Sequence, residues 1–445
     1  MTEPVIVSRE HHAISRRHID SDALKVLYRL HEHGHTAYLV GGSVRDLLLG
    51  RRPKDFDIGT SAHPYQIKKL FRNCWIIGRR FRLAHIKFGP KTVEVATFRR
   101  IVDPQADAAA AAGEAVVVAS APEPAAAAAG VQPFHRDNTF GTPEEDAFRR
   151  DFTINGLFYD IGSFAVIDYV GGLGDLERRV VRSIGDPRVR FVEDPVRMLR
   201  AAVMTARLGF DLDPLVTEAI AEHRALITTA SPARLLEEYF KILRSGYAEA
   251  TFAALGRLRL LELITPPLRN PPASFWDALA RLDQFRVAFP SAPPELTSTV
   301  LVGTLLEPLG LVSPGVAAGR ARDPQAERLS FGMLPVARRD VERLRQVVEI
   351  APRLLDPVVS PRAARSLPHR PAFPDALTWL SIHADRPDVV AEWKRLRPHR
   401  PPPAGPGGPA PAEPVGPRRR RRRRRRRRGR GGGRGPDSGP GPASA

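Results

Sequence analysis

Helical periodicity and short apolar runs alternate along the first 170 residues of the chain. Leu24 and Leu27 fall on one face of a helix predicted over 22–33, with Ser21 at its N-cap and Gly34 just past its end. The pattern then predicts strands over 37–40, 55–58, 82–88, 92–98, 156–160 and 165–169, and helices over 44–49 and 64–71. Helices mixed with short, mainly antiparallel strands indicate an α+β domain with a small mixed sheet, rather than a doubly wound fold.

From residue 194 to about residue 395 the periodicity is helical almost throughout. The predicted helices are 194–208, which ends at Gly209, then 214–227, and a third that begins at the Ser231 cap and ends before Gly246. We therefore predict an α+β head followed by an all-helical neck and body. The predicted divisions are an N-terminal extension (1–20), a head (21–170), a neck (171–246), a body (247–397) and a tail (398–445).

Composition adds two segments without a fold. The 445 residues are 42% hydrophobic, too many for a wholly disordered chain, yet 43 Pro and 35 Gly are too many for helices and strands alone. Residues 103–132 are nearly all Ala, Val, Pro, Gly and acidic residues, which predicts a disordered insertion in the head. An Ala-rich helix is the alternative, but Gly113, Pro122 and Pro124 weaken it.

Positive charge gathers in the tail. The chain carries a net +19, of which residues 401–445, with 13 Arg, supply +11 and the rest of the chain +8. Such a tail cannot bury enough surface to fold, but its arginines attract a polyanion through counterion release. RNA or another nucleic acid is the expected partner; a solvated tail or an address signal is the plainer interpretation.

Several classes of protein are excluded. Cys74 is the single cysteine, so neither an intramolecular disulfide nor a cysteine-based zinc site can form, in keeping with a reducing cytoplasm. No signal-peptide core and no apolar run of the ~18–20 residues that span a membrane occurs. We expect a cytoplasmic protein without membrane contact.

The first chemical signal is Gly41-Gly42-Ser43 between a predicted strand and a predicted helix. Two glycines let the backbone approach an anion, and the N–H groups that open a helix can bind a phosphate. Arg45 in the first helical turn is placed to add a charge-assisted bond to a triphosphate. Alone, a Gly-Gly pair more often serves a turn.

The second signal is a pair of carboxylates, Asp55 and Asp57, two residues apart on the strand predicted over 55–58. Both project from one face of such a strand, where they repel unless cations lie between them. Two Mg²⁺ ions about 3.5–4 Å apart would resolve the repulsion and activate a hydroxyl. A solvated strand edge is the plainer interpretation, but beside the glycine loop the pair predicts nucleotidyl transfer.

A third carboxylate is expected at such a site. Glu94, which alternates with Val93 and Val95, is one candidate, and a solvent-facing strand position is its plainer interpretation. Asp151 is the other candidate, and its plainer interpretation is a helix N-cap or a salt bridge to Arg149. The sequence leaves this choice open.

A further polar group lies near the start of the helix predicted over 194–208. Glu193 and Arg197 are four residues apart, and Arg200 follows three later, so their polar groups share a helical face. A carboxylate beside a guanidinium offers the hydrogen bonds of a base edge and suits a nucleobase where no template exists. A helix-stabilising ion pair is the plainer interpretation.

Three motifs together resemble the class II nucleotidyltransferases, the family of bacterial poly(A) polymerases and CCA-adding enzymes within the polymerase-β-like superfamily. They are GGSVRDLLLG with KDFD (41–50, 54–57), RRDFTIN (149–155) and EDPVRMLR (193–200); the segments 9–17, 78–85 and 136–141 resemble the poly(A) polymerase branch. The resemblance implies a polymerase-β-like head and catalytic roles for Asp55, Asp57 and Asp151. The expected nucleotide-binding residues are Gly41, Gly42, Ser43, Arg45, Arg150, Asn155, Asp194, Arg197 and Arg200, and the expected metal ligands are Asp55 and Asp57, with Glu94 as a candidate third.

The predicted function is template-independent addition of AMP from ATP to RNA 3′ ends with release of pyrophosphate, using Mg²⁺ or Mn²⁺ and promoting RNA processing and decay. RNA-decay or RNA-chaperone proteins are the expected protein partners. CCA addition to tRNA is the nearest alternative, because the same catalytic core performs it. A non-catalytic RNA-binding scaffold is the more distant one.

Overall fold

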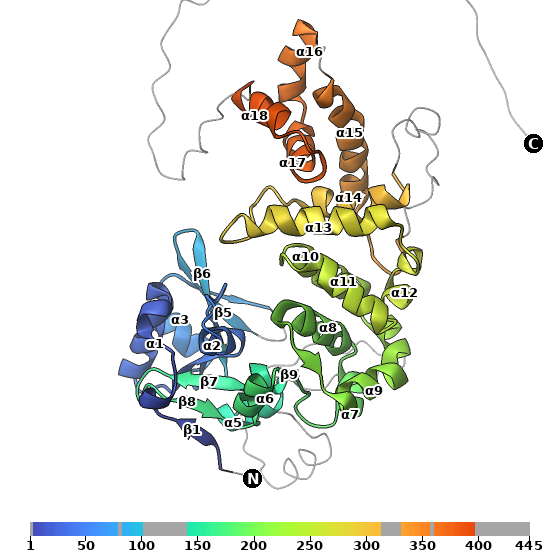
Figure 1. Ribbon diagram of the computed structural model, residues 1–445. Coiled ribbons are helices and arrows are strands. Elements are labelled where there is room, and N and C mark those ends of the chain that lie inside the picture. The colour runs from blue at the N-terminus through green and yellow to red at the C-terminus, as the bar shows by residue number, and fades with distance from the viewer. Residues whose placement is uncertain (1–2, 79–81, 101–139, 313–330, 357–359, 397–445) are drawn as a thin grey trace, which may run out of the picture. The chain divides into compact units, whose positions relative to one another are not determined.

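The computed structural model describes residues 3–78, 82–100, 140–312, 331–356 and 360–396 (Figure 1). The insertion predicted over 103–132 and the tail predicted over 398–445 lie outside these residues. So do parts of the segments 78–85 and 136–141, which carry some of the resemblance to poly(A) polymerases.

The head is built on one mixed sheet of eight strands in the order β1-β8-β7-β2-β3-β6-β5-β4. Its neighbouring strands are antiparallel except β3 and β6, which run parallel. The strands are β1 (Val5–Val7), β2 (Ala37–Val40), β3 (Ile58–Thr60), β4 (Cys74–Ile77), β5 (Leu83–Phe88), β6 (Lys91–Thr97), β7 (Leu157–Asp160) and β8 (Val166–Asp168). The predicted α+β class and mixed sheet are therefore confirmed, although the sheet is larger than expected.

Two helices pack on one face of this sheet. α1 (Ser21–Glu32) contacts β2 and β3, and α3 (Pro64–Leu70) contacts β4 and β5. Strand residues that point toward them are apolar and buried, which completes a core on this side; they include Leu39, Ile58, Ala84, Ile86, Val93 and Val95. The N-cap of α1 is Asp20, whose carboxylate accepts the N–H groups of Asp22 and Ala23, so the predicted cap at Ser21 is wrong by one residue.

The prediction of a strand over 55–58 is wrong, because β3 begins only at Ile58. From Ile58 onward the chain pairs with β2 on one side and β6 on the other, and all three residues of β3 are buried. Asp55 and Asp57 are exposed, and a central position in the sheet would remove both carboxylates from water. They therefore lie in the segment that leads into the strand.

The N-terminal extension also contributes to the head. β1 pairs with β8 at the edge of the sheet, so residues 5–7 belong to the head rather than to a separate segment. The pattern of apolar positions did not predict this short strand. The hairpin of β5 and β6 and the pair β7–β8 follow the prediction to within one residue at most boundaries.

The region after the sheet is mainly helical. Asp194 and Pro195 separate α7 (Pro187–Glu193) from α8 (Val196–Leu208), so Glu193 ends one helix and Asp194 lies between the two rather than inside a single helix. The other elements are α5 (Pro143–Phe148), η3 (Thr153–Asn155), α6 (Gly172–Arg178), β9 (Val180–Val181), β10 (Asp211–Leu212), α9 (Pro214–His223), η4 (Arg224–Thr229) and α10 (Pro232–Leu243). β9 and β10 form a small parallel pair that the all-helical prediction did not include.

The described residues between 248 and 396 again form mainly helices. α8 packs against α11, and α10 contacts α13 and α14, so one continuous core joins the two regions. The elements are α11 (Ala248–Arg257), α12 (Leu261–Ile264), α13 (Ala273–Val287), α14 (Ser298–Leu306), α15 (Arg338–Leu355), α16 (Pro361–Ser366), α17 (Phe373–His383) and α18 (Pro387–Leu396). Within the described residues, no helix combines the length and the apolar character that crossing a bilayer requires.

Gly59 in β3 offers a test of how tightly the strand beside Asp57 is packed. A Cβ at Gly59 would lie 2.6 Å from a ring carbon of Phe98, which is itself buried. We expect Gly59→Ala to lower stability by about 1–3 kcal/mol, measured by urea unfolding. The control is Gly256→Ala in α11, where the added methyl meets nothing within 4 Å and Ala favours the helix. Equal stabilities of the two variants would contradict the packing described here.

Candidate active site

The glycine loop joins β2 to α2 (Gly42–Leu48), as the sequence predicted. Gly41 has φ +69°, a conformation that favours glycine, and its N–H donates to the carbonyl of Leu157. A Cβ on Gly41 would lie 2.9 Å from Nη1 of Arg150, so the guanidinium rests against the bare backbone. Ser43 is buried and its hydroxyl donates to the carbonyl of Val40, which fixes the turn.

The two predicted catalytic aspartates lie at the end of the sheet next to this loop. The Val40 N–H donates to the Asp57 carbonyl at 3.1 Å, so Asp57 stands directly beside the residue that precedes Gly41. Ile58 pairs with Val95 in the parallel register of β3 and β6, which sets Asp57 beside Glu94. Of the two candidates for a third carboxylate, Glu94 is the one that this register brings to Asp57.

The electrostatics of Asp57 agree with this placement. Partial burial, together with the nearby carboxylates of Glu94 and Asp55, raises the pKa of Asp57 to about 6 against the opposing effect of Arg150. The side chain still reaches solvent. Three acidic groups and one guanidinium therefore act on one another at the mouth of the glycine loop.

This donor set fits a divalent cation in its chemistry. Carboxylate oxygens are the ligands that Mg²⁺ prefers, and the mutual repulsion of Asp55, Asp57 and Glu94 is the charge that a cation would neutralise. Among the described residues no group of three or more acidic, histidine or cysteine side chains is already drawn together around a metal position. Asp55, Asp57 and Glu94 match a divalent cation in their ligand type and in their charge.

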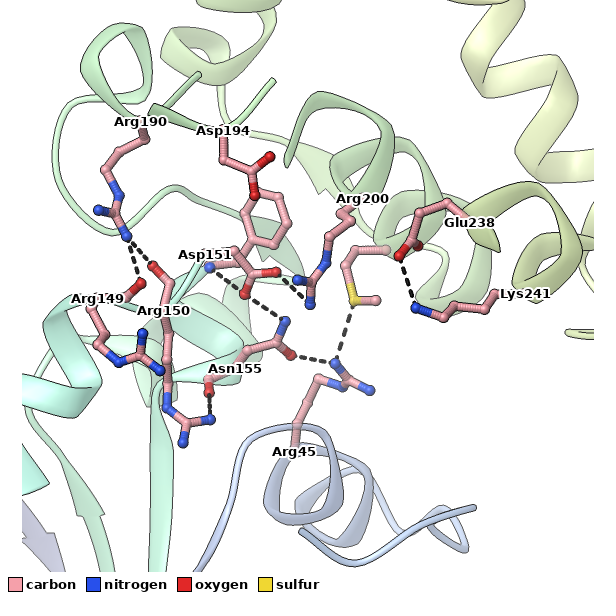
Figure 2. Close-up of polar contacts among 12 residues, drawn as sticks. Arg45, Arg149, Arg150, Asp151, Asn155, Arg190, Asp194, Arg200, Glu238 and Lys241 are labelled. Atoms are coloured by element: carbon pink, nitrogen blue, oxygen red, sulfur yellow. Dashed lines mark hydrogen bonds and ion pairs between the residues drawn. The ribbon is translucent and has the colours of Figure 1, made fainter. Parts of the chain in front are cut away.

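Arg45 does not face this opening. Its side chain is only 2% exposed, and all three of its nitrogens are engaged inside the protein. Nε and Nη2 donate to Oδ1 of Asp46. Nη1 donates to Oδ1 of Asn155 and to the sulfur of Met204 (Figure 2). Burial lowers the pKa of Arg45 and Asp46 opposes the shift. Arg45 is therefore turned inward in the structure, and its predicted charge-assisted bond to a triphosphate stays a prediction.

Asp151 is likewise committed to internal contacts. Its Oδ1 accepts the Phe152 N–H at 2.8 Å and the Asn155 side-chain amide at 3.1 Å, and its Oδ2 lies 2.9 Å from Nη2 of Arg200 on α8 (Figure 2). Burial would raise the pKa of Asp151, but Arg200 and these hydrogen bonds outweigh it and lower the pKa. We therefore do not place Asp151 among the metal ligands.

These contacts form one chain of paired polar groups, which we call the polar chain: Asp46, Arg45, Asn155, Asp151 and Arg200. Arg207 of α8 closes it, since its Nη2 lies 2.6 Å from Oδ2 of Asp46. The polar chain joins α2 and η3 of the head to α8.

Arg150 remains as the basic side chain at the glycine loop. Its Nε and Nη2 donate to Asp146, at 3.2 and 2.9 Å, and the group lies over the Phe158 ring. Arg190 of α7 holds the backbone of this segment, because its Nη2 donates to the carbonyls of Arg149 and Arg150 (Figure 2). The Arg150 side chain is thus oriented but still partly exposed.

The predicted base-binding group occupies the start of α8. Arg197 donates from Nη1 to Glu193 at 2.8 Å and to the Arg190 carbonyl at 2.9 Å, so the predicted pairing of Glu193 with Arg197 is present. Asp194 instead takes a two-pronged ion pair from Arg234 of α10, at 2.9 and 2.7 Å.

Sequence reasoning missed several residues of this site, namely Asp46, Asp146, Arg190, Arg207 and Arg234. Three of the five are buried below a tenth of their surface, and the exceptions are Arg207 and Arg234. Of these residues, Asp46 could have been found from the sequence. It directly follows Arg45 inside a helix whose other residues are apolar or small.

Comparison with known proteins shows what the region around the site is similar to. Residues 37–182 match the family described as "Poly A polymerase head domain", and residues 209–270 match "Probable RNA and SrmB- binding site of polymerase A". These two regions are thus similar to the head and to the RNA-binding part of poly(A) polymerases. Residues 37–182 contain the glycine loop, both aspartates and Asp151, so this part of the candidate site lies within the match to that head.

Relatives of two kinds are similar to the N-terminal part of this chain. Poly(A) polymerase I of Escherichia coli O6:H1 is 47% identical over 268 residues, 59% of this chain and 54% of that protein. That of Haemophilus influenzae is 41% identical over 261 residues, 57% of this chain and 53% of that protein. The CCA-adding enzyme of Bacillus pumilus is 34% identical over 243 residues, 54% of each chain. The chain spans about half the length of the curated relatives it matches.

A solved structure extends the likeness to the fold beyond the head. The CCA-adding enzyme of Bacillus stearothermophilus in complex with CTP has a TM-score of 0.56 at 25% identity, over 84% of this chain and 81% of that chain. The polymerase-β-like fold of a poly(A) polymerase head followed by helices is therefore confirmed.

The buried position of Arg45 gives a testable prediction. Asp46→Ala leaves the Arg45 guanidinium without its carboxylate, so we expect a loss of about 3–5 kcal/mol in the free energy of unfolding, measured with urea. Arg45→Met with Asp46→Leu removes both charges and should recover most of the loss. If Arg45 makes no direct contact with the triphosphate and the apolar pair keeps α2 in place, the KM for ATP in this double variant stays near that of the parent protein. A rise of tenfold or more would restore the predicted triphosphate contact.

The raised pKa of Asp57 predicts a pH dependence of stability. The folded protein holds this proton more tightly than the unfolded chain, so the contribution of Asp57 to stability is present below about pH 4 and is lost as pH rises through about 6. Without divalent cations, Asp57→Asn should therefore melt higher than the parent protein at pH 8 and at the same temperature at pH 4.

Thermal melting in EDTA measures this difference. Glu392→Gln, at an exposed acid on α18, is the control and should shift the melting temperature equally at both pH values. Mg²⁺ should stabilise the parent protein but not Asp57→Asn. If the difference in melting temperature between Asp57→Asn and the parent protein were the same at pH 4 and pH 8, the repulsion of Asp57 by Glu94 and Asp55 would be contradicted.

Proposed function

We propose that this protein transfers AMP from ATP to the 3′ end of RNA without a template and releases pyrophosphate. The observation that carries the proposal is the meeting of Asp55, Asp57 and Arg150 at the glycine loop. Transfer of a nucleotidyl group requires acidic side chains that hold cations, a basic side chain, and backbone N–H groups not covered by side chains, all at one place. Pyrophosphate as leaving group demands positive charge on the side away from the attacking hydroxyl.

In this proposal Asp55 and Asp57 hold the divalent cations, with Glu94 as the acid nearest to Asp57. Bound Mg²⁺ or Mn²⁺ would lower the pKa of the attacking hydroxyl and neutralise the departing phosphates. Arg150 binds the phosphates beside the Gly41 backbone, against which the absence of a side chain lets its guanidinium rest. Asp146 and the Phe158 ring keep its guanidinium aimed at this position.

The polar chain has a positioning role. Its pairs fix the start of α2 against η3 and α8, so the Gly41–Gly42 backbone and Arg150 keep their spacing when substrate binds. We therefore move Arg45, Asn155 and Asp151 from the predicted set of direct contacts to the support of the site. Arg200 belongs to this support through Asp151.

Asp194 and Arg197 are proposed to contact the base. The internal contacts of Arg197 run through Nη1, and an arginine carries further donors on Nε and Nη2 that suit the acceptors of a purine. Adenine as the base is supported by the identity of 47% with Poly(A) polymerase I, against 34% with a CCA-adding enzyme.

CCA addition to tRNA is the second candidate. It is supported by the likeness to the CCA-adding enzyme of Bacillus stearothermophilus in complex with CTP, which shares the fold over 84% of this chain. The head chemistry is common to both candidates, so the choice depends on which base the α8 region accepts.

The deciding experiment incubates the full chain with an oligoribonucleotide or a tRNA lacking its 3′ end, and supplies ATP or CTP separately with Mg²⁺. We expect long tails of A on the oligoribonucleotide and no extension with CTP, read on a sequencing gel. Addition of two C and then one A, on the tRNA alone, would refute the proposal and establish the second candidate.

The matched control removes the proposed cation ligand. Asp57→Asn should lower the rate of AMP addition by more than about a hundredfold, since partners outside the inner ligand shell of a metal already contribute about 10–100-fold. A variant that retains the rate of the parent protein would show that the cations bind elsewhere. Glu392→Gln on α18 again serves as the unaffected variant.

A further inference from the structure

An exposed apolar patch lies at the edge of the head sheet formed by β4. Trp75 is 50% exposed and Ile77 is 48% exposed, whereas Cys74 between α3 and the sheet is buried. The alternation along β4 therefore turns Trp75 and Ile77 to the face of the sheet opposite α1 and α3. Large exposed apolar side chains on one face indicate a surface that binds a partner.

The strand registers connect this patch with the candidate catalytic acids. Trp75 pairs with His85 across β4 and β5, and His85 pairs with Glu94 across β5 and β6. Glu94 in turn stands beside Asp57, because Ile58 pairs with Val95. Directly paired residues project from the same face of a sheet, so Trp75, His85, Glu94 and Asp57 form one row.

The row changes its chemistry from one end to the other. At the outer end, Nζ of the exposed Lys87 lies 5.1 Å from the centre of the Trp75 ring. In the middle, Nε2 of His85 lies 3.6 Å from Glu94. At the inner end stand the carboxylates that suit cations. An exposed aromatic ring beside a lysine is the combination that binds a base and its phosphate in single-stranded nucleic acids.

We propose that this row is the platform for the RNA primer, with a base near the 3′ end stacked on Trp75 and its phosphate paired with Lys87. The inference rests on the proposed function and extends it to the second substrate. Three strand spacings separate Trp75 from Asp57, about 14 Å, so a strand whose 3′-hydroxyl reaches the cations at Asp57 passes Trp75 a few nucleotides earlier.

Stacking suits a primer whose sequence is not fixed. Every base has a flat face, so a tryptophan accepts the original 3′ end as well as each nucleotide that is added later. An edge strand can also pair with a strand of another protein. Lys87 beside the ring and the continuity of the row with Asp57 favour RNA, and a protein partner is an outcome that the tests below would reveal.

The first test measures steady-state extension of a short oligo(A) primer by the full chain. Trp75→Ala should raise the KM for the primer about tenfold, because stacking of one base on an aromatic ring contributes this order of affinity, and should leave kcat and the KM for ATP unchanged. Trp75→Phe should restore most of the affinity. Tyr65→Ala, which removes an exposed ring from α3, is the control and should change nothing.

Primers with one abasic nucleotide locate the stacked base. At one position near the 3′ end, loss of the base should raise the KM of the parent protein but not of Trp75→Ala, because the ring that it would stack on is already missing. An unchanged KM for the primer in Trp75→Ala would overturn the proposal. So would abasic primers whose KM rises by the same factor in Trp75→Ala as in the parent protein, and either result would favour a protein partner for the patch.

A binding test separates this inference from the proposed function. The chain has four tryptophans, so the difference in fluorescence between the parent protein and Trp75→Phe reports Trp75. Oligo(A) should quench this difference signal by stacking, even in a preparation that adds no nucleotide. A difference signal that does not respond to oligo(A) would overturn the platform, whether or not the extension assay succeeds.

Discussion

The polar chain through Asp46, Arg45, Asn155, Asp151 and Arg200 is the interaction on which the candidate site depends. Charges removed from water are tolerated only when each is paired and hydrogen-bonded, so its members cannot move independently. Because α8 holds both ends, through Arg200 and Arg207, the head and the first long helix after it are fixed to each other. Asp194 and Arg197, the predicted base-binding residues, lie at the start of α8, so the same attachment holds them in position.

The site divides its charged residues by burial. Arg45, Asp46 and Asp151 of the polar chain are buried, where a low dielectric makes their ion pairs strong and the loss of a partner costly. Asp55, Asp57 and Glu94 are exposed, and at least Asp57 feels the other two. Buried charges thus hold the framework, while the exposed acids keep the unbalanced charge that a cation would satisfy.

The sheet has two faces with different tasks. One is filled by α1, α3 and apolar strand residues, and it supplies the core of the head. The other presents Trp75, His85 and Glu94 in one row that leads to Asp57. A single strand register therefore relates the stability of the head, the proposed catalytic acids and the proposed primer platform.

Local patterns in the sequence determined most of the elements and the main parts of the site. Alternation located β2 and the hairpin of β5 and β6, and Gly41-Gly42 indicated the turn that the structure forms with φ +69° at Gly41. Residues near one another in the chain decide such features, so a linear reading finds them. The pattern missed the start of β3, since two flanking strands decide it.

Only the tertiary structure decided the role of each charged side chain. Arg45 looks like an exposed phosphate ligand in its motif, but Asn155 and Met204, more than a hundred residues away, enclose it. Glu94 lies beside Asp57 through a parallel pairing that no spacing in the sequence reveals, and Arg234 reaches Asp194 from another helix. The physical reason is that burial and partners come from distant segments, and these, rather than residue type, set whether a charge supports the fold or meets a ligand.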